Sequence, residues 1–168
     1  MIRTILTYPN PELKKKSEPV TVIDDSILEL IRDMSETMYN APGIGLAAPQ
    51  IGVHQRVIVI DVSPKDGPPD LVVAINPVIV YAEGEVYEEE GCLSVPKYAA
   101  NVRRQARVIV KGLNPEGVEQ TWKAEELLAI AFQHEIDHLE GILFVDHLSL
   151  LKRELFQRKA RKTAEANR

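Results

Sequence analysis

The stretch EELLAIAFQHEIDHLE, residues 125–140, is the segment around which the rest of the sequence is interpreted. Its apolar side chains recur around nearly the whole circumference of a helix, a pattern typical of a helix buried in the middle of a domain. Buried polar groups are costly unless they have partners, so the histidines and glutamates of this segment need one. We therefore predict a central buried helix whose polar residues share a partner, and a metal ion would supply it.

Within this helix, His134 and His138 frame the pattern H-E-x-x-H. Residues four apart on a helix lie on one face, with about 5–6 Å between their Cβ atoms, so both imidazoles can bind one metal ion. Glu135 directly follows the first histidine and can reach a water molecule on that ion. The pattern is short and occurs by chance, but its place on an apolar helix predicts a metal site.

A catalytic metal ion usually has three protein ligands and one open position. The third ligand could lie downstream, but only His147 and the glutamates of the C-terminal tail follow the motif. The single thiol, Cys92, is the better candidate, although a lone cysteine is more often a small core residue. His54 and His147 lie in loop-like contexts, where we expect solvated side chains without a role.

Three apolar residues that precede His134 predict a pocket wall. Leu127, Ile130 and Ala131 share the helix face that bears the two histidines. An apolar wall one to two turns from a metal ion suits an unbranched side chain such as methionine. The same residues can also fill the core, since pocket walls are packed too.

Composition predicts one soluble domain over residues 1–168, with 45% hydrophobic and 27% charged residues. The single cysteine excludes an intramolecular disulfide and suits a reducing compartment. The N-terminal residues lack the apolar run of a signal peptide, and no segment approaches the roughly 18 apolar residues that cross a bilayer. We therefore expect a cytoplasmic protein that does not associate with a membrane. A monomer is also expected, although these features do not bear on it.

Charge is distributed unevenly along the chain. Residues 151–168 carry a net charge of +5, whereas the whole chain carries −5, so the preceding residues are strongly acidic. We expect a basic C-terminal helix at about 149–166, with Ser149 as its N-cap. Such a helix is either simply solvated or docks electrostatically on ribosomal RNA, and the sequence leaves both open.

Periodicity predicts the other elements. Ile27, Ile31, Met34 and Met38 form the apolar stripe of a helix that starts near Asp24 and stops at Pro42-Gly43. Apolar, β-branched runs predict strands over residues 56–62, 71–80, 84–89, 103–112 and 118–124. Within the second of these runs, Pro77 is expected at a strand end, an edge or a bulge.

The stretch GIGLAAPQ, residues 43–50, is expected to be a loop of small residues. It formally fits the dinucleotide fingerprint, but a helix precedes it and Pro49 with a strand-like run follows, so that interpretation is rejected. What remains is a backbone that something can approach closely, with Gln50 offering an amide at the end of the loop.

Three stretches in this order, GIGLAAPQ (43–50), EGCLSVP (90–96) and QHEIDHLEG (133–141), resemble the three motifs of the peptide deformylases. These enzymes remove the N-formyl group from new bacterial and organellar polypeptides. The resemblance extends along much of the chain. It implies an α+β fold in which antiparallel β-sheets pack around the motif-bearing helix, with one helix in the N-terminal half and another at the C-terminus.

The resemblance also implies roles for individual residues. Cys92, His134 and His138 would hold the metal ion with its water, and Glu135 would be the catalytic carboxylate. The Gln50 side chain and the Leu93 backbone N–H would bind the developing oxyanion. The substrates would be N-formylmethionyl nascent peptides, and the residues expected to bind them are Gly43, Ile44, Gly45, Leu127, Ile130 and Ala131. Ala99 stands where relatives commonly have a basic residue, so no particular charged contact with the peptide is predicted.

The identity of the metal and two alternative functions stay open on residues alone. A thiolate with two imidazoles accepts Zn²⁺, Fe²⁺, Ni²⁺ or Co²⁺, and the resemblance implies Fe²⁺ in the cell. An H-E-x-x-H zinc peptidase would cleave internal peptide bonds with a third ligand other than Cys92, and would leave the other two motifs unexplained. A non-enzymatic metal-binding or ribosome-associated module would need a closed four-ligand site, for which the chain offers no further cysteine or well-placed histidine.

Overall fold

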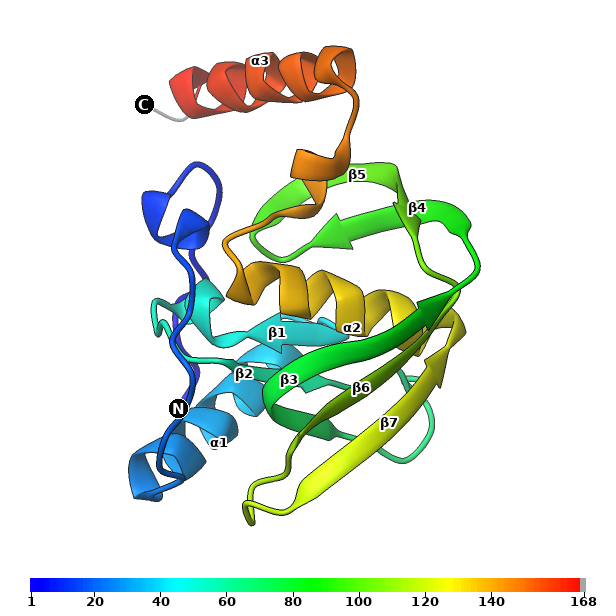
Figure 1. The fold of residues 1–168 in the computed structure, drawn as a ribbon. Coiled ribbons are helices and arrows are strands. Elements are labelled where there is room, and N and C mark those ends of the chain that lie inside the picture. Colours follow the sequence, from blue (N-terminus) through cyan, green and yellow to red (C-terminus); the bar gives the residue numbers. More distant parts are fainter. Residues whose placement is uncertain (167–168) are drawn as a thin grey trace.

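The apolar runs of the sequence pair into two antiparallel sheets that enclose one helix (Figure 1). The computed structural model describes residues 1–166. Its strands are β1 (Gly45–Ala47), β2 (Val57–Ile60), β3 (Val72–Glu83), β4 (Val86–Cys92), β5 (Val95–Arg104), β6 (Arg107–Leu113) and β7 (Glu119–Glu125). Its helices are α1 (Asp25–Asn40), α2 (Glu126–Leu139) and α3 (Leu150–Ala166), with short 3₁₀ turns at Pro11–Lys14, Ala48–Ile51 and Phe144–His147. This is the α+β architecture implied by the resemblance.

The larger sheet has the order β1-β2-β3-β6-β7, and β4 and β5 form a separate hairpin. Helix α2 lies between the two, as Figure 1 shows. Ala129, Phe132 and Leu139 are fully buried and pack with residues of β1, β2 and β6 in one apolar cluster. The predicted central helix is therefore confirmed, and its other side is turned toward the hairpin.

Helix α1 packs on the larger sheet through the predicted stripe. Asp24 caps it, because its Oδ1 accepts hydrogen bonds from the backbone N–H groups of Ser26 (3.1 Å) and Ile27 (3.2 Å). The stripe residues are all buried, and they share an apolar cluster with Leu46 and Val57. The helix ends before Pro42, where the Gly43 N–H donates to the Met38 carbonyl at 2.8 Å.

Two strand predictions need correction. The predicted strand over residues 103–112 is wrong as a single element, because β5 ends at Arg104 and β6 begins at Arg107, where the chain passes from the hairpin to the larger sheet. The strand predicted over 71–80 extends to Glu83, and Pro77 lies at a register shift between Ile75 and Val78, which confirms its expected place at a bulge.

The GIGLAAPQ stretch is not a loop. Gly45–Ala47 forms β1, which pairs with β2 at the edge of the larger sheet, and Ala48–Ile51 forms a 3₁₀ turn. Three residues, one of them glycine, are too few to produce a readable strand pattern. The outer edge of β1 has no neighbouring strand among the residues the structure describes.

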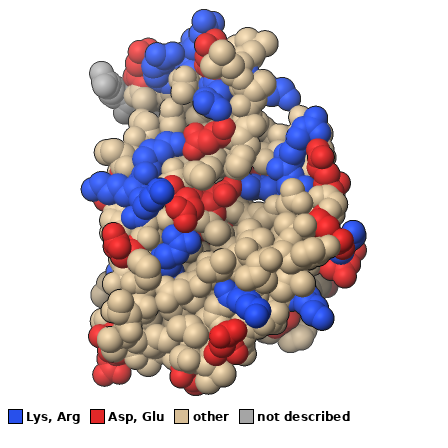
Figure 2. Space-filling model, viewed as in Figure 1, with Lys and Arg blue, Asp and Glu red and all other residues tan. Residues whose placement is uncertain are grey.

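Helix α3 extends away from the body at the top of Figure 1. It begins after Ser149, whose Oγ accepts from the Lys152 N–H at 3.3 Å, so the predicted cap is confirmed. Phe156 holds it to the body by ring contacts with Tyr8 (4.9 Å) and Tyr98 (4.7 Å). Figure 2 shows Lys and Arg side chains along this helix. Within residues 1–166, no helix is long and apolar enough to cross a membrane.

Candidate active site and metal centre

Three side chains with ligand atoms converge where α2 faces the hairpin. Cys92 is the last residue of β4, and His134 and His138 lie one turn apart on α2. The Nε2 atoms of the two histidines are 3.3 Å apart, and the Cys92 Sγ is 3.4 Å from the His138 Nε2. All three ligand atoms lie within 4.8 Å of one another. The structure thus brings the motif histidines to the sole thiol, as the resemblance implied.

The residues present fit a divalent metal ion. Metal–nitrogen bonds of about 2.0–2.1 Å and metal–sulfur bonds of about 2.3 Å place tetrahedral ligand atoms roughly 3.3–3.6 Å apart. The two separations given above, 3.3 and 3.4 Å, lie in that range. Three protein ligands leave one coordination position for water or substrate, which is the arrangement of catalytic rather than structural sites.

A buried carboxylate orients one of the histidines. The Nδ1 of His134 lies 3.0 Å from Glu90 Oε1, so the ring donates there and its Nε2 is free for a metal ion. Arg104 donates to the same carboxylate from Nε (2.8 Å) and from Nη2 (2.9 Å). Burial alone would raise the pKa of Glu90, but the hydrogen bonds and charges of Arg104 and His134 lower it to about 2. Glu90 is therefore ionised, and the sequence alone had not identified it.

The same arginine links this carboxylate to the far side of α2. Its Nη1 donates to Asp137 Oδ2 at 2.7 Å, and Asp137 Oδ2 also lies 2.8 Å from the Nε2 of His147. His147 is exposed, as expected, and its ring is also paired with this carboxylate. His54, for which exposure was also expected, is only partly exposed, and its Nε2 pairs with Glu12. Both contacts join residues that are separated in sequence, so no local sequence pattern predicts them.

Glu135 lies beside the ligands in a different environment. Its side chain is buried, and no hydrogen-bond partner is found for Oε1 among the described residues. Burial raises the pKa of Glu135 to about 7, although the charges of His134 and Arg104 oppose the shift. Gly45 is packed against it, since a Cβ at Gly45 would overlap the Glu135 carboxylate. A glycine is therefore required at this position, because its backbone lies so close to the Glu135 carboxylate.

The histidine rings have unequal proton affinities. Burial lowers the pKa of His138 well below its ordinary value, which favours the neutral ring that metal binding needs. Burial acts in the same direction on His134, but hydrogen bonding to Cys92, the charge of Glu135 and the bond to Glu90 raise its pKa well above the ordinary value. A metal ion at Nε2 would compete with that proton, while Glu90 would hold the one on Nδ1.

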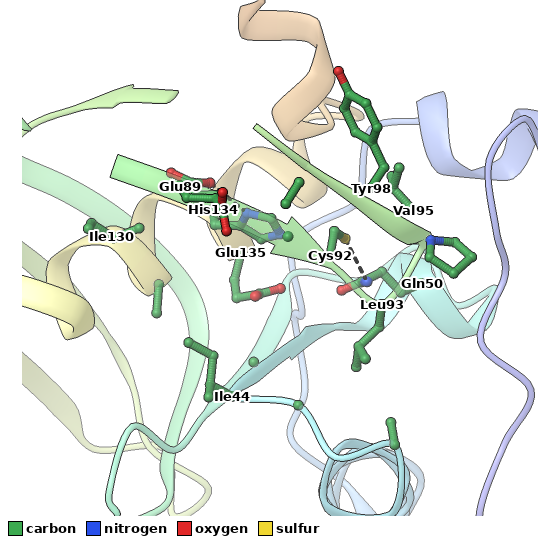
Figure 3. A pocket seen from close by; sticks show the side chains of 18 of the residues that line it. Ile44, Gln50, Glu89, Cys92, Leu93, Val95, Tyr98, Ile130, His134 and Glu135 are labelled. Carbon is green, nitrogen blue, oxygen red and sulfur yellow. Dashed lines mark hydrogen bonds and ion pairs between the residues drawn. The ribbon is translucent and has the colours of Figure 1, made fainter. Parts of the chain in front are cut away.

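Gln50 points its amide at the thiol. Its Oε1 accepts from the Ala47 N–H at 2.9 Å, which fixes the amide so that Nε2 donates to Ser94 Oγ at 3.0 Å and lies 3.6 Å from Cys92 Sγ. Figure 3 shows Gln50 and Leu93 on the same side of Cys92. The Leu93 side chain packs against Gly43, where a Cβ would come within 2.7 Å of it. Both residues predicted to bind an oxyanion therefore flank the ligand cluster.

A cavity of about 900 Å³ opens in front of these groups. Its lining includes nearly every residue predicted for catalysis, metal binding or substrate binding: Gly43, Ile44, Gly45, Gln50, Cys92, Leu93, Leu127, Ile130, Ala131, His134 and Glu135. His138 lies behind them, buried at 1% exposure. Leu127 stands at the mouth with 47% exposure, so the predicted apolar wall runs from the solvent down to the ligands.

An open three-ligand site, an unpaired buried carboxylate and a free strand edge along one cavity define the class as metal-dependent hydrolases that act on peptides. Comparison with known proteins identifies the family within that class. The family model described as polypeptide deformylase matches residues 2–154. The chain therefore belongs to the polypeptide deformylase family.

Individual relatives agree along the whole length. The chain is 54% identical over 158 residues to a peptide deformylase of Thermodesulfovibrio yellowstonii, covering 94% of this chain and 96% of the relative. The crystal structure of a peptide deformylase from Legionella pneumophila is 47% identical, with a TM-score of 0.92, covering 99% of this chain and 98% of that one. A peptide deformylase from Ehrlichia chaffeensis in complex with actinonin gives a TM-score of 0.90 at 40% identity, covering 96% and 97% of the two chains.

The protein is accordingly a metal-dependent hydrolase that removes the formyl group from N-formylmethionine peptides, a step in protein biosynthesis. The alternative of an H-E-x-x-H zinc peptidase is not favoured, because the family match spans all three motifs.

Proposed function

We propose that Cys92, His134 and His138 hold one divalent ion, which is Fe²⁺ in the cell, and that Glu135, Gln50 and Leu93 perform the deformylation. The observation that carries the proposal is the convergence of three ligand atoms within 4.8 Å beside a buried carboxylate whose Oε1 lacks a partner in residues 1–166. When bound, the ion supplies a Lewis acid that polarises the formyl oxygen and makes water nucleophilic near neutral pH.

Glu135 moves the proton. It takes a proton from the attacking water and returns it to the departing amine of the methionine. Its pKa of about 7, raised by burial, suits a group that must both accept and release a proton at cellular pH. Its neighbour Gly45 leaves room for this carboxylate at the cavity wall.

Gln50 and Leu93 stabilise the tetrahedral oxyanion. The Gln50 Nε2 and the Leu93 backbone N–H donate to the oxygen on which negative charge develops, and one such donor typically contributes about 3 kcal/mol. The anchoring of Gln50 Oε1 by the Ala47 N–H supports this role, because the amide then needs little reorganisation during the reaction.

The peptide binds as an additional strand along β1. The Ile44 carbonyl accepts from the Asp61 N–H at 2.8 Å, so the backbone of Ile44 is directed toward β2. Because polar backbone groups alternate in direction along a strand, those of Gly45 face the cavity and are available to an extended peptide. The side chain of Ile44 borders the cavity, and Leu127, Ile130 and Ala131 receive the methionine side chain.

The test is formate release from a formyl-Met peptide by protein loaded anaerobically with Fe²⁺, compared with Zn²⁺-, Ni²⁺- and Co²⁺-loaded protein. We expect the Fe²⁺ form to be active and Cys92→Ala to lose tight metal binding. Stoichiometric metal retained in Cys92→Ala would remove the thiol from the ligand set. Release of formate at the wild-type rate by Glu135→Ala with metal bound would remove Glu135 from the reaction.

We further propose that the protein works as a cytoplasmic monomer and that α3 docks on ribosomal RNA near emerging nascent chains. Support comes from the basic residues along α3, which is held to the body mainly through Phe156. Replacing Arg158, Arg161 and Lys162 by Gln leaves the ring contacts of Phe156 with Tyr8 and Tyr98 untouched. It should weaken ribosome co-sedimentation in a salt-dependent way while small-peptide turnover persists. Unchanged co-sedimentation would contradict docking, and analytical ultracentrifugation tests the monomer.

A further inference from the structure

The side-chain amide of Gln50 is held at both of its ends. Its Oε1 accepts from the Ala47 N–H at 2.9 Å, and its Nε2 donates to the hydroxyl oxygen of Ser94 at 3.0 Å. Gln50 is 1% exposed and Ser94 is fully buried, so water does not compete for these contacts. Because the amide is planar, two contacts at opposite ends fix its orientation as well as its position.

The contact with Ser94 decides where the second N–H of the amide points. An amide nitrogen carries two hydrogens, and only one of them is used by Ser94. The same Nε2 lies 3.6 Å from Cys92 Sγ, a contact drawn as a dashed line in Figure 3. Gln50 and Cys92 both line the active-site cavity. The remaining N–H is therefore directed at the ligand cluster, where negative charge develops in the proposed reaction.

Ser94 is itself fixed through its backbone. Its carbonyl accepts from the Tyr8 N–H at 2.8 Å, and the carbonyl of Gln50 accepts from the Leu6 N–H at 2.7 Å. One short N-terminal segment thus joins the 3₁₀ turn that carries Gln50 to the turn that follows β4. The Ser94 N–H also lies 3.4 Å from Cys92 Sγ. The hydroxyl, the amide and the ligand thiol are therefore connected in one network of hydrogen bonds.

Resting on the oxyanion role proposed for Gln50, we propose that Ser94 is a positioning residue for deformylation. Its hydroxyl oxygen accepts one N–H of Gln50 and thereby aims the other at the oxyanion. Ser94 is absent from the cavity lining, so it acts through Gln50 and not on the substrate. An amide anchored only at Oε1 would have to reorient during the reaction, and a donor that must reorient stabilises charge less well.

The first experiment measures formate release from formyl-Met-Ala-Ala by Fe²⁺-loaded Ser94→Ala. We expect kcat to fall about tenfold, less than the typical loss of about 10²–10³-fold when an oxyanion donor is removed outright. KM should stay within about twofold of the wild-type value, because the lost contribution arises only in the transition state. Metal content and the Co²⁺ absorption spectrum should be those of the wild type, since the ligands are unchanged.

A double-mutant cycle separates positioning from a general structural role. Gln50→Ala alone should lower kcat about 10²–10³-fold. Adding Ser94→Ala to that variant should lower kcat by no more than about twofold, because the hydroxyl then has no amide to orient. A serine that only supported the fold would cost the same factor in both backgrounds.

The matched control is Ser17→Ala. Ser17 is also buried, at 6% exposure, it lies outside the cavity lining, and its Oγ has no hydrogen-bond partner within residues 1–166. Its replacement should leave kcat at the wild-type value. Ser94→Gly removes the same hydroxyl as Ser94→Ala and is measured beside it, so a folding defect in one variant leaves the test to the other.

Four results would overturn the inference: a wild-type kcat without the Ser94 hydroxyl, a loss that lies mainly in KM, an equal loss with and without Gln50, or the same loss in Ser17→Ala. Failure of the proposed oxyanion role looks different. In that case Gln50→Ala itself would release formate at the wild-type rate.

Discussion

Two buried carboxylates lie close to the ring of His134, Glu90 on the hairpin side and Glu135 on α2, and their pKa values move in opposite directions. Glu90, 7% exposed, is paired with Arg104 and His134, and its pKa is lowered to about 2. Glu135, 4% exposed, has an oxygen without a partner, and burial raises its pKa to about 7. Burial is nearly equal, so pairing decides the difference.

The difference separates two tasks that a single kind of side chain performs in one site. The paired carboxylate is ionised and accepts a hydrogen bond from the ring of His134, whereas the unpaired one is the group that we propose exchanges a proton. The neighbours of the two carboxylates also come from different elements. Arg104 reaches Glu90 across the hairpin, and the neighbour of Glu135 is Gly45, which offers no side chain.

Glu135→Gln tests the role of the unpaired carboxylate, and it has the largest expected effect. Removal of a positioned proton acceptor typically slows a reaction by 10²–10⁴-fold, so we expect kcat to fall by about a thousandfold. Metal content, measured by atomic absorption, should stay at one ion per chain because the ligands are untouched. Activity above a tenth of the wild-type value would mean that Glu135 does not carry the proton.

The same substitution should change the pH dependence of stability in metal-free protein. The pKa of Glu135 is about 7 in the folded protein against an ordinary value of 4.5, so stability falls as the pH rises from 4.5 to 7 and the full cost is present above pH 7. The pKa difference corresponds to about 3 kcal/mol. Glu135→Gln should therefore be more stable than the wild type at pH 8 by up to that amount.

This gain should shrink as the pH falls from 7 and vanish below 4.5, where the carboxyl is protonated in both folded and unfolded chains. Urea unfolding of both proteins in EDTA at pH 8, 6 and 4 measures the difference. A gain that is equal at all three pH values would show that burial of charge is not its cause.

Glu90→Gln tests the role of the paired carboxylate. Loss of the carboxylate that orients a metal-bound histidine typically weakens metal binding 10–100-fold, and we expect a loss in that range. Competition with a chelator measures it, and Co²⁺ absorption spectra report the ligand geometry. Glu89→Gln is the neighbouring control and should bind metal as the wild type does. Wild-type affinity in Glu90→Gln would leave His134 oriented by other contacts.

The smallest effect on metal affinity is expected for His147, which lies furthest from the ligands in the chain of contacts that leads to Glu90. His147→Ala removes the contact with Asp137, which reaches His134 only through Arg104 and Glu90. We expect metal affinity to fall about threefold, below the range for a direct partner. His54→Ala breaks a similar histidine–carboxylate pair, that with Glu12, far along the chain from the ligands. Equal effects of the two variants would show that the Asp137 contact has no special connection to the metal site.

The sequence predicted the surroundings of the unpaired carboxylate, Glu135, better than those of the paired carboxylate, Glu90. The spacing of His134, Glu135 and His138 is local and follows directly from helix geometry. The resemblance supplied Cys92, Gln50 and Leu93, which lie on other elements. The Glu90–Arg104 pair joins residues of two strands, and one of these, β5, was not predicted before residue 103. Without that strand, no register could bring the arginine to the carboxylate.

The same limit explains the other corrections. Strand β1 is three residues long and contains glycine, so alternation could not identify it. The corner between β5 and β6 is set by Gln133 of α2, whose Nε2 donates to the Gln105 carbonyl at 2.9 Å while its Oε1 accepts from the Gln105 N–H at 2.9 Å. These two tertiary hydrogen bonds end the strand at a position where β-propensity alone would continue it.

The separate hairpin has a consequence for the architecture as a whole. Cys92 belongs to the two-stranded sheet, while His134 and His138 belong to the helix that packs on the five-stranded sheet. An ion bound by all three is therefore a cross-link between independently hydrogen-bonded layers, and it closes a long loop of chain between residues 92 and 134. Closing such a loop reduces the conformational entropy of the unfolded chain. An ion held at the proposed site would thereby also join the hairpin to the body of the protein.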